Sequence, residues 1–218
     1  MIEVLYQDNH LLAANKPAGI PSQSTPDREG FDAQCRRWLK ETTGKPGNVF
    51  LHATHRLDTP VSGIILFAKT SKALSRIQQM IREFKLEKYY LAIVEGSPLP
   101  IEGELIHYLG HDERAHKAFV TTPSKGKLAK LTYRTLNTDN ELTLLEIHLI
   151  TGRYHQIRAQ LSAHKQPIIG DKKYESTHPF VNGEAIALHH ARLLLPHPIT
   201  QEILTVKAPL PPYWHLRD

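Results

Sequence analysis

The chain has 218 residues, and its 27 Lys and Arg against 22 Asp and Glu give a formal net charge of +5 with His neutral. No apolar run approaches the ~20 residues of a membrane-spanning helix. The start, MIEVLYQDNH, lacks the basic and apolar regions of a secretory signal. The one cysteine, Cys35, excludes disulfides within this sequence and a cysteine-cluster zinc site. We therefore expect a cytoplasmic protein, whose charge suits either a polyanionic partner or a merely solvated basic face.

The N-terminal part of the chain predicts two strands, a helix and a buried strand. IEVLYQD and HLLAANKP have the pattern of short strands, with a turn at Asp8–Asn9 between them. Residues 31–41 carry their apolar side chains, among them Cys35, on one side, which predicts a helix. Residues 63–69 (GIILFAK) form an almost continuous apolar run, typical of a strand covered on both faces.

The next segment predicts a second helix followed by a strand. Thr70 or Ser71 can cap the helix. Apolar side chains then recur at helical spacing at Leu74, Ile77, Ile81 and Phe84. The stretch KYYLAIVEG returns to a strand pattern and ends at Gly96.

The second half of the chain predicts mostly strands. Residues 100–127 are rich in Gly, His and charge, and we expect an irregular, exposed excursion. AKLTYRTL and ELTLLEIHL resemble a hairpin around Thr138–Asn140, YHQIRAQLSAH predicts a short helix, and strands follow near 186–195 and 202–207. The fold class predicted is α+β, with a large mixed, mostly antiparallel sheet flanked by helices and loops.

The stretch HRLDTPVSG places Arg56 and Asp58 two residues apart, immediately before the buried strand. Burial raises the pKa of a carboxyl group, whereas a nearby guanidinium lowers it. A carboxylate held ionised in a dry cleft is a candidate nucleophile or base. The alternative is a structural ion pair that caps the turn.

Two further residues bear on that choice. Arg158 lies on a polar face of the helix in TGRYHQIRAQ, where solubility does not require it, although a plain surface role is the alternative. Tyr90 alternates with the apolar residues of its strand and can point inward, where it either acts or only packs.

Several segments together resemble one family. HRLDTPVSGIILFAK resembles the HRLD-x-x-[TS]-SG signature of the RluA-type pseudouridine synthases. VLYQDNHLLAANKPAGIPS is similar to the family's opening segment, EKYYLAIVEG to its K-x-Y strand, and KGKLAKLTYRTL to its G-K-x-A-x-T-x-Y hairpin. TGRYHQIRAQLSAHKQPIIGD resembles its TGR-x-HQ-[IL]-R helix and following turn, and LHHARLLLPHP and KAPLP resemble its closing segments. These segments occur in the family's order over nearly the whole chain.

The resemblance implies a single catalytic domain over residues 1–218 with the pseudouridine synthase fold. It implies that a uridine of structured tRNA or rRNA is isomerised to pseudouridine without a cofactor. Asp58 is then the nucleophile, either on the sugar C1′ or through a glycal route. Arg158 pairs with Asp58 and keeps it ionised, and Tyr90 stacks near the uracil and assists proton removal. Arg56 fills the space left when the target nucleotide is extruded, while Leu57 points the other way and anchors the turn in the core.

This sequence departs from the family's pattern at a few positions. Gln160 stands where His is frequent, Val61 stands where Thr precedes the serine, and Glu175 follows Tyr174 where Gly is usual. The small S4-like RNA-binding domain that precedes the catalytic segment in many relatives is not in this sequence. We therefore expect the catalytic domain itself to choose the target.

Four other residues are candidates for RNA contact beside Arg56. Lys16 in NKPAG is expected at the surface of a turn, within reach of a phosphate at the rim of the site. His55 belongs to the polar cluster beside Arg56, and His155 either contacts RNA or caps its helix. Lys172 lies in an expected surface loop that suits contacts to the RNA backbone.

Two alternatives to a pseudouridine synthase stay open. One is a non-catalytic RNA-binding or ribosome-assembly protein on the same fold, although such a protein would be expected to lose the carboxylate or its arginine. The other is a histidine-based nuclease or metal hydrolase, suggested by 14 histidines. No H-E-x-x-H spacing occurs, and the adjacent His189 and His190 point to opposite faces of a strand, so we expect no metal. A monomer is the expected state.

Overall fold

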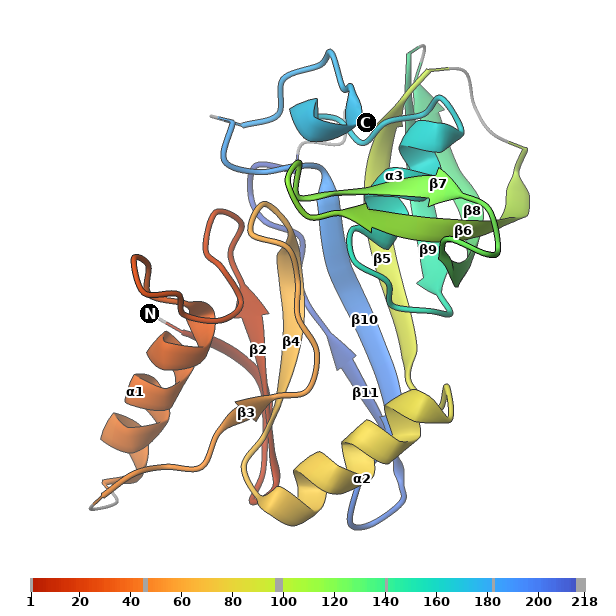
Figure 1. Ribbon diagram of the computed structural model, residues 1–218. Helices are drawn as coiled ribbons and strands as arrows, with labels where there is room; N and C mark the ends of the chain where they lie inside the picture. The colour runs from red at the N-terminus through yellow and green to blue at the C-terminus, as the bar shows by residue number, and fades with distance from the viewer. Residues whose placement is uncertain (1, 45–46, 97–99, 140, 182, 215–218) are drawn as a thin grey trace. The chain divides into compact units, whose positions relative to one another are not determined.

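The computed structural model describes residues 2–44, 47–96, 100–139, 141–181 and 183–214, which contain eleven strands and three α-helices (Figure 1). The chain divides into two compact units. Unit 1 runs to Leu86 and resumes at His190, and unit 2 is Glu87–His189. Within the described ranges, no helix is long and apolar enough to cross a membrane. The predicted α+β class with a mixed, mostly antiparallel sheet is confirmed.

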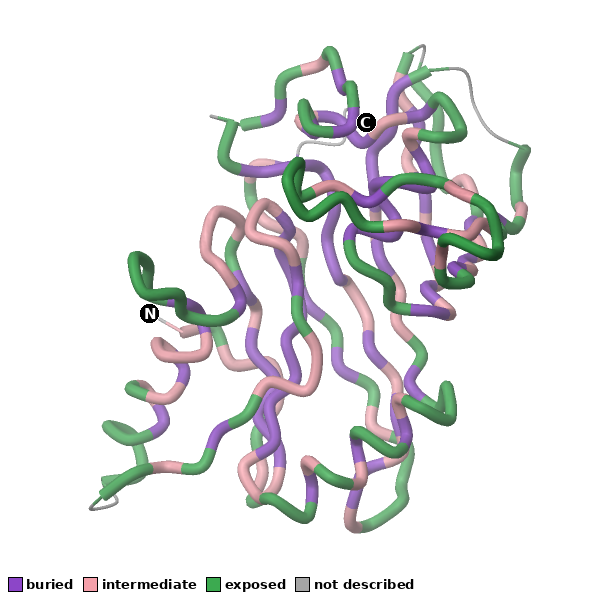
Figure 2. The backbone as a smooth tube through the Cα atoms, viewed as in Figure 1, coloured by how far each residue is buried: buried purple, intermediate pink, exposed green. Residues whose placement is uncertain are grey.

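The strands of unit 1 centre on two apolar, antiparallel strands, β2 (Leu11–Lys16) and β4 (Ser62–Ala68). Strand β2 pairs antiparallel with β1 (Glu3–Gln7) and with β4. Strand β4 also pairs with β3 (His52–Ala53). Strand β10 (Leu188–Pro196) pairs antiparallel with β11 (Ile203–Lys207). The Asp8 carboxylate forms the β1–β2 turn, because its Oδ1 accepts the N–H groups of His10 at 2.7 Å and Leu11 at 2.6 Å. All seven residues of β4 are buried, as the apolar run predicts (Figure 2).

Two helices contribute to the core of unit 1. Helix α1 (Phe31–Thr43) buries Phe31, Cys35 and Leu39 and ends at Gly44, whose positive φ of 60° suits a left-handed C-cap. Helix α2 (Ser71–Arg82) begins after Thr70, whose side chain accepts the N–H of Ala73. Its buried residues pack with those of β2, β4, β10 and β11 in one hydrophobic cluster.

Gly63 shows why the second residue of β4 must be a glycine. Its φ is +115°, and a Cβ at this position would lie 2.4 Å from the backbone oxygen of His190. No larger residue fits without moving backbone. The glycine therefore brings the start of β4, five residues after Asp58, into close contact with β10.

Unit 2 is an antiparallel sheet in the order β5-β9-β8-β6-β7. Its strands are β5 (Glu87–Glu95), β6 (Glu102–Asp112), β7 (Lys117–Thr121), β8 (Lys127–Asp139) and β9 (Leu142–Leu149). The predicted β8–β9 hairpin is confirmed, with Asp139 opposite Leu142, while Asn140 of the expected turn lies outside the described residues. Helix α3 (Gln156–Ala163) packs on β6 and β7, and Gln160 Nε2 donates to Leu105 O at 3.0 Å.

The irregular excursion expected over residues 100–127 is wrong. Strands β6 and β7 form a hairpin there, and β6 pairs with β8 over eight residues. Backbone pairing rather than burial holds this hairpin, since Leu105, Leu109 and Ala118 are its buried residues while most of the others face solvent. A strand with so few buried positions has a sequence that reads as a polar loop.

Candidate active site

Asp58 lies on a tight turn that leads into β4. The N–H of Val61 donates to the Asp58 carbonyl at 3.0 Å, which closes the turn. Asp58 itself is half-buried. Leu57 before it is buried, so the prediction that Leu57 anchors the turn in the core is confirmed.

Ser22 holds the residue before Asp58. Its Oγ donates to the carbonyl of Leu57 at 2.6 Å and accepts the N–H of the same residue at 2.9 Å. Both residues are buried. Because one hydroxyl satisfies both backbone groups of Leu57, the direction in which the chain enters Asp58 is fixed. Sequence reasoning missed Ser22, which lies 35 residues before its partner.

Lys16 and Gly19 hold the residue after Asp58. Lys16 Nζ donates to Thr59 O at 3.2 Å, and it also donates to Pro17 O at 2.9 Å and Ile20 O at 2.8 Å. The Gly19 N–H donates to the same Thr59 oxygen at 2.8 Å. The loop after β2 therefore fixes the backbone on both sides of Asp58.

The surface position expected for Lys16 is wrong, and with it the expected phosphate contact. The residue is 0% exposed, and three carbonyl oxygens surround its ammonium group. Burial lowers the pKa of Lys16 to about 7. The Arg28 charge also lowers this pKa, whereas the Asp58 carboxylate raises it. Lys16 is thus an internal positioning group whose charge interacts with that of the Asp58 carboxylate.

The other two members of the polar cluster differ in exposure. Arg56 is exposed, and its Nη1 lies 3.5 Å from Gln23 Oε1, which suits a residue that contacts RNA. His55 is half-buried, and its Nε2 accepts the N–H of Leu66 at 3.2 Å. That nitrogen is therefore used within unit 1, and the contact of His55 with RNA stays a prediction.

In unit 2, Tyr90 is buried on β5, opposite Ile147 of β9. The inward orientation predicted from its alternation along the strand is confirmed. Its neighbour Tyr89 points to the other face of the sheet, as the two-residue repeat of a strand requires.

Arg158 makes a buried bidentate ion pair with Asp171. The Nε–Oδ2 distance is 2.6 Å and the Nη2–Oδ1 distance is 2.9 Å, and the two side chains are 5% and 2% exposed. The alternative of a plain surface role for Arg158 is wrong, because the helix is buried over Gln156–Leu161. A paired guanidinium is planar and held in one orientation. Asp171 was missed, although a carboxylate directly after the apolar Pro167–Gly170 run is a signal for a buried acid.

His155 is the N-cap residue of α3 and is buried. Its φ is +49°, and its side chain makes no capping bond. Its Nδ1 lies 3.1 Å from the hydroxyl of Tyr174. His155 therefore caps α3 by its position, as one of the two expectations had it, but without a side-chain hydrogen bond. Its contact with RNA stays a prediction.

Lys172 is exposed at the start of the 3-10 helix η1 (Lys172–Tyr174), as predicted. Its contact with RNA stays a prediction. The approach of Asp58 in unit 1 to Tyr90 and Arg158 in unit 2 also stays a prediction.

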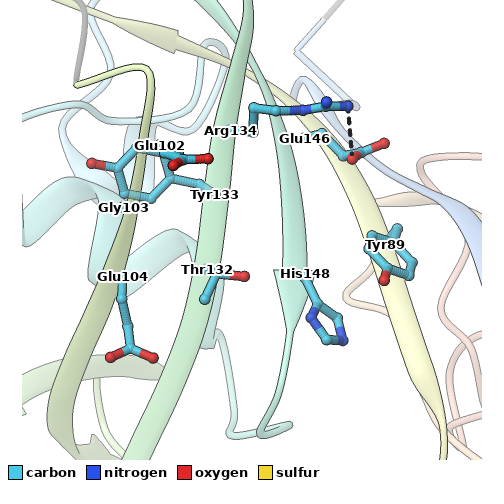
Figure 3. A pocket seen from close by; sticks show the side chains of 9 residues that line it. All are labelled: Tyr89, Glu102, Gly103, Glu104, Thr132, Tyr133, Arg134, Glu146 and His148. Atoms are coloured by element: carbon cyan, nitrogen blue, oxygen red, sulfur yellow. Dashed lines mark hydrogen bonds and ion pairs between the residues drawn. The ribbon is translucent and has the colours of Figure 1, made fainter.

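A hollow of about 610 Å³ lies on the face of the unit 2 sheet that carries Tyr89, Thr132 and His148 (Figure 3). Three carboxylates, those of Glu102, Glu104 and Glu146, line it, and Arg134 pairs with Glu146 at 3.4 Å. None of the predicted site residues lines this hollow. Because carboxylates repel phosphate, we assign the hollow no role in RNA binding. Among the described residues, no group of three or more His, Cys, Asp or Glu could hold a metal ion.

The sequence matches known proteins along its length. Residues 10–163 match the family model described as RNA pseudouridylate synthase. The chain is 34% identical over 212 residues to the dual-specificity RNA pseudouridine synthase RluA of Haemophilus influenzae, which covers 95% of this chain and 92% of that one. It is 33% identical over 213 residues to YhcT of Bacillus subtilis, described as an uncharacterized RNA pseudouridine synthase. This match covers 96% of this chain and 69% of that one.

A solved structure is similar in fold. Human RNA pseudouridylate synthase domain containing 4 matches with a TM-score of 0.81 over 97% of this chain and 89% of that chain, at 24% identity. The pseudouridine synthase fold implied by the sequence motifs is confirmed.

Proposed function

We propose, from the premise that this chain belongs to the RNA pseudouridylate synthase family, that it acts on structured tRNA or rRNA with Asp58 as its nucleophile. The enzyme class itself is established by that membership: the protein is an isomerase that converts uridine in RNA to pseudouridine. The cytoplasm is the compartment that we propose for it. The observation that carries the assignment is the turn of Asp58, whose two flanking residues are fixed by Ser22 and Lys16.

The reaction needs a nucleophile or base but no external reagent. The bond between uracil N1 and C1′ breaks, the base rotates, and a bond forms between C5 and C1′. The C5 proton is then lost, and N1 carries a proton in the product, so atoms and electrons balance. The Asp58 carboxylate either attacks C1′ directly or removes a sugar proton on the way to a glycal. A half-buried carboxylate on a fixed turn suits both routes because the backbone that carries it is held in place.

Arg158 and Tyr90 complete the proposed active site. We assign Arg158 the role of keeping Asp58 ionised, since a guanidinium beside a carboxylate favours its charged form. The Asp171 pair supports this assignment, because it engages Nε and Nη2, which leaves the direction of the guanidinium fixed. Tyr90 is proposed to stack near the uracil and to assist removal of the C5 proton, which its burial on β5 suits.

Arg56 is proposed to replace the target nucleotide in the RNA stack. A half-buried carboxylate cannot reach C1′ of a stacked nucleotide, so the nucleotide must be extruded at a cost of a few kcal/mol. An exposed guanidinium can stack on the neighbouring bases and offset part of that cost. Arg56 lies next to the buried Leu57 and two residues from Asp58, which supports assigning insertion and chemistry to one short segment.

The nucleophile is tested with Asp58→Asn. This variant is expected to abolish pseudouridine formation and to leave RNA binding within a few fold of the wild type. Asp27→Asn, which changes an exposed carboxylate of the same unit, is the control and should retain activity. Persistent activity of Asp58→Asn would show that another group is the nucleophile.

The flipping role is tested with Arg56→Ala on two RNAs that carry the same target uridine. Turnover should fall more on a helical RNA than on a flexible single strand, since only the helix must be opened. Equal losses on both would exclude this role.

The RNA class is tested by pseudouridine sequencing of total RNA with and without the gene. Sites that disappear on deletion identify tRNA, rRNA or both as the substrate. If no site disappears from tRNA or rRNA, the proposed substrate class fails.

A further inference from the structure

Tyr154 is an exposed aromatic residue supported from below by other rings. Its ring stacks on His155 with a centroid distance of 3.9 Å and an interplanar angle of 17°. His155 in turn contacts the ring of Tyr174 edge-on at 5.7 Å. While His155 and Tyr174 are buried, Tyr154 is 41% exposed. Tyr154, His155 and Tyr174 thus form a column of rings that begins at the surface of unit 2 and ends in its core.

The lower end of this column contacts Arg158. The Arg158 guanidinium carbon lies 5.0 Å from the centre of the Tyr174 ring, a cation–π distance. The same ring has Lys117 Nζ at 4.9 Å. A nucleotide stacked on Tyr154 would thus be connected through His155 and Tyr174 to Arg158, the proposed catalytic arginine.

The upper end of the column is held in place and flanked by positive charge. The ring of the exposed His111 on β6 has its centroid 4.4 Å from that of Tyr154, at an interplanar angle of 54°. The Tyr154 hydroxyl donates to His116 O at 3.4 Å. The neighbouring Arg153 is exposed, and its Nε donates to Leu128 O at 2.9 Å. Lys173 Nζ donates to His116 O at 3.2 Å, which places another exposed cation at this turn. Proteins that bind single-stranded nucleic acid stack its bases on exposed aromatic rings and attract its backbone with nearby cations.

We propose that His111 and Tyr154 form a stacking platform for one unpaired base of the RNA substrate, next to the extruded uridine. This inference rests on the proposed function, since it takes RNA as the ligand. Tyr154 occupies the x position of the TGR-x-HQ segment, which the motif leaves open, so the platform belongs to this chain rather than to the signature. Binding by stacking is tolerant of base identity, because every base has an aromatic face.

A ring already packed on another ring is well suited to this role. The contacts to His155, His111 and His116 O hold Tyr154 in one orientation before RNA arrives. Little side-chain entropy is then lost when a base stacks on it. The platform should therefore contribute to RNA affinity and leave the chemical step alone.

The test uses the hairpin RNA that carries the uridine mapped by comparative sequencing, with 2-aminopurine replacing one neighbouring base at a time. Stacking quenches 2-aminopurine fluorescence. Tyr154→Ala is expected to relieve the quenching at one position, and to raise Kd and KM about tenfold with kcat changed less than twofold. A tenfold change corresponds to about 1.4 kcal/mol, within the range for one stacked base.

Two controls separate stacking from other effects of the substitution. Tyr154→Phe keeps the ring but loses the bond to His116, and it should bind within twofold of the wild type. Phe50→Ala removes a comparable ring in unit 1, one that is 39% exposed and 4.4 Å from His52, and should leave Kd unchanged. Tyr154→Leu, which retains apolar bulk, replaces the alanine variant if thermal unfolding shows that alanine disrupts the column.

The results distinguish this proposal from the one it rests on. If the wild type forms no pseudouridine in any RNA, the proposed function fails. If the wild type is active but Tyr154→Ala binds the hairpin within twofold and the quenching persists at every position, the platform is overturned. Equal losses in Tyr154→Phe and Tyr154→Ala also overturn it, because the hydroxyl rather than the ring would then matter.

Discussion

The hydroxyl of Ser22 satisfies both backbone groups of Leu57, donating to its carbonyl at 2.6 Å and accepting its N–H at 2.9 Å. Leu57 immediately precedes the proposed nucleophile. A single side chain therefore sets the backbone direction at Asp58. This contact makes Ser22 a positioning residue of the site, although it does not touch the reacting atoms.

Ser22→Ala should leave the Leu57 N–H and C=O unpaired inside the protein. We expect a loss of about 2 kcal/mol in the free energy of unfolding, because a buried polar group without a partner is costly. We also expect kcat to fall by about tenfold, since Asp58 loses its fixed geometry. Urea unfolding and single-turnover pseudouridine formation measure the two effects.

Two variants serve as controls for this prediction. Ser22→Thr keeps the hydroxyl and should restore most of the activity. Ser24→Ala removes an exposed hydroxyl that contacts Asp32, and should cost less than about 1 kcal/mol. A Ser22→Ala variant as stable and as active as the wild type would contradict the positioning role.

Lys16 should make the stability of the protein depend on pH above neutrality. Its pKa is about 7 in the folded protein and near 10.5 when unperturbed, so between these values the unfolded chain binds the extra proton. Stability rises with pH wherever the unfolded state binds more protons. The contribution of Lys16 to the free energy of unfolding should increase by up to about 1.4 kcal/mol per pH unit over this window.

Denaturant unfolding at several pH values, from 7 to 10, measures that slope. Lys16→Met removes the titrating group and should flatten the curve relative to the wild type. Lys40→Met, which changes an exposed lysine of α1, should keep the wild-type slope. Parallel curves for Lys16→Met and the wild type would mean that Lys16 does not carry the lowered pKa.

Asp171→Asn should destabilise the protein strongly because it removes the carboxylate that forms the bidentate pair with the buried Arg158. Breaking a buried ion pair from one side costs roughly 3–5 kcal/mol. Pseudouridine formation should also fall, since the guanidinium would lose its fixed direction. Thermal unfolding and turnover at a temperature where the variant is folded separate the two losses.

The chain offers an exposed ion pair for comparison. Lys130 Nζ and Glu104 Oε1 are 2.6 Å apart, but both side chains are 38% exposed. Glu104→Gln should therefore cost less than about 1 kcal/mol. If Asp171→Asn were equally mild, the buried pair would not be needed for stability.

Glu175→Gly should stabilise the protein by up to about 1 kcal/mol. Glu175 follows η1 with φ +72°, a left-handed conformation that is unfavourable for a residue with a Cβ. Glycine relieves that cost, although part of the gain is lost to its greater freedom when unfolded. Chemical denaturation measures the difference.

Glu175→Ala is the control because it keeps the Cβ while removing the carboxylate, which lies 3.8 Å from Lys117. It should give no gain. A gain of the same size in both variants would assign the effect to charge instead of backbone conformation.

Much of the fold followed from local patterns in the sequence. The apolar run before Lys69 predicted a strand covered on both faces, and β4 is buried throughout. Thr70 predicted the start of α2 and caps it. The helical spacing misled only at its end, because Phe84 lies beyond the last turn with φ +54° and is exposed. Periodicity detects an element but locates its end poorly.

The contacts that position the site could not be predicted in the same way. Ser22 meets Leu57 across 35 residues and Arg158 meets Asp171 across 13, and neither pair has a periodic signal. Lys16 was expected at the surface because lysine is almost never fully buried without partners. Its three carbonyl partners come from the loop after β2 and the Asp58 turn, and only folding brings them together.

The ion pair of Arg158 and Asp171 also constrains how this protein can diverge. A lineage that changes either residue alone passes through an intermediate with an unmatched interior charge, so the two positions should vary jointly or stay fixed. Directed-evolution libraries that randomise residue 158 by itself would then sample mainly unfolded proteins. Libraries that diversify both codons together would reach more folded replacements.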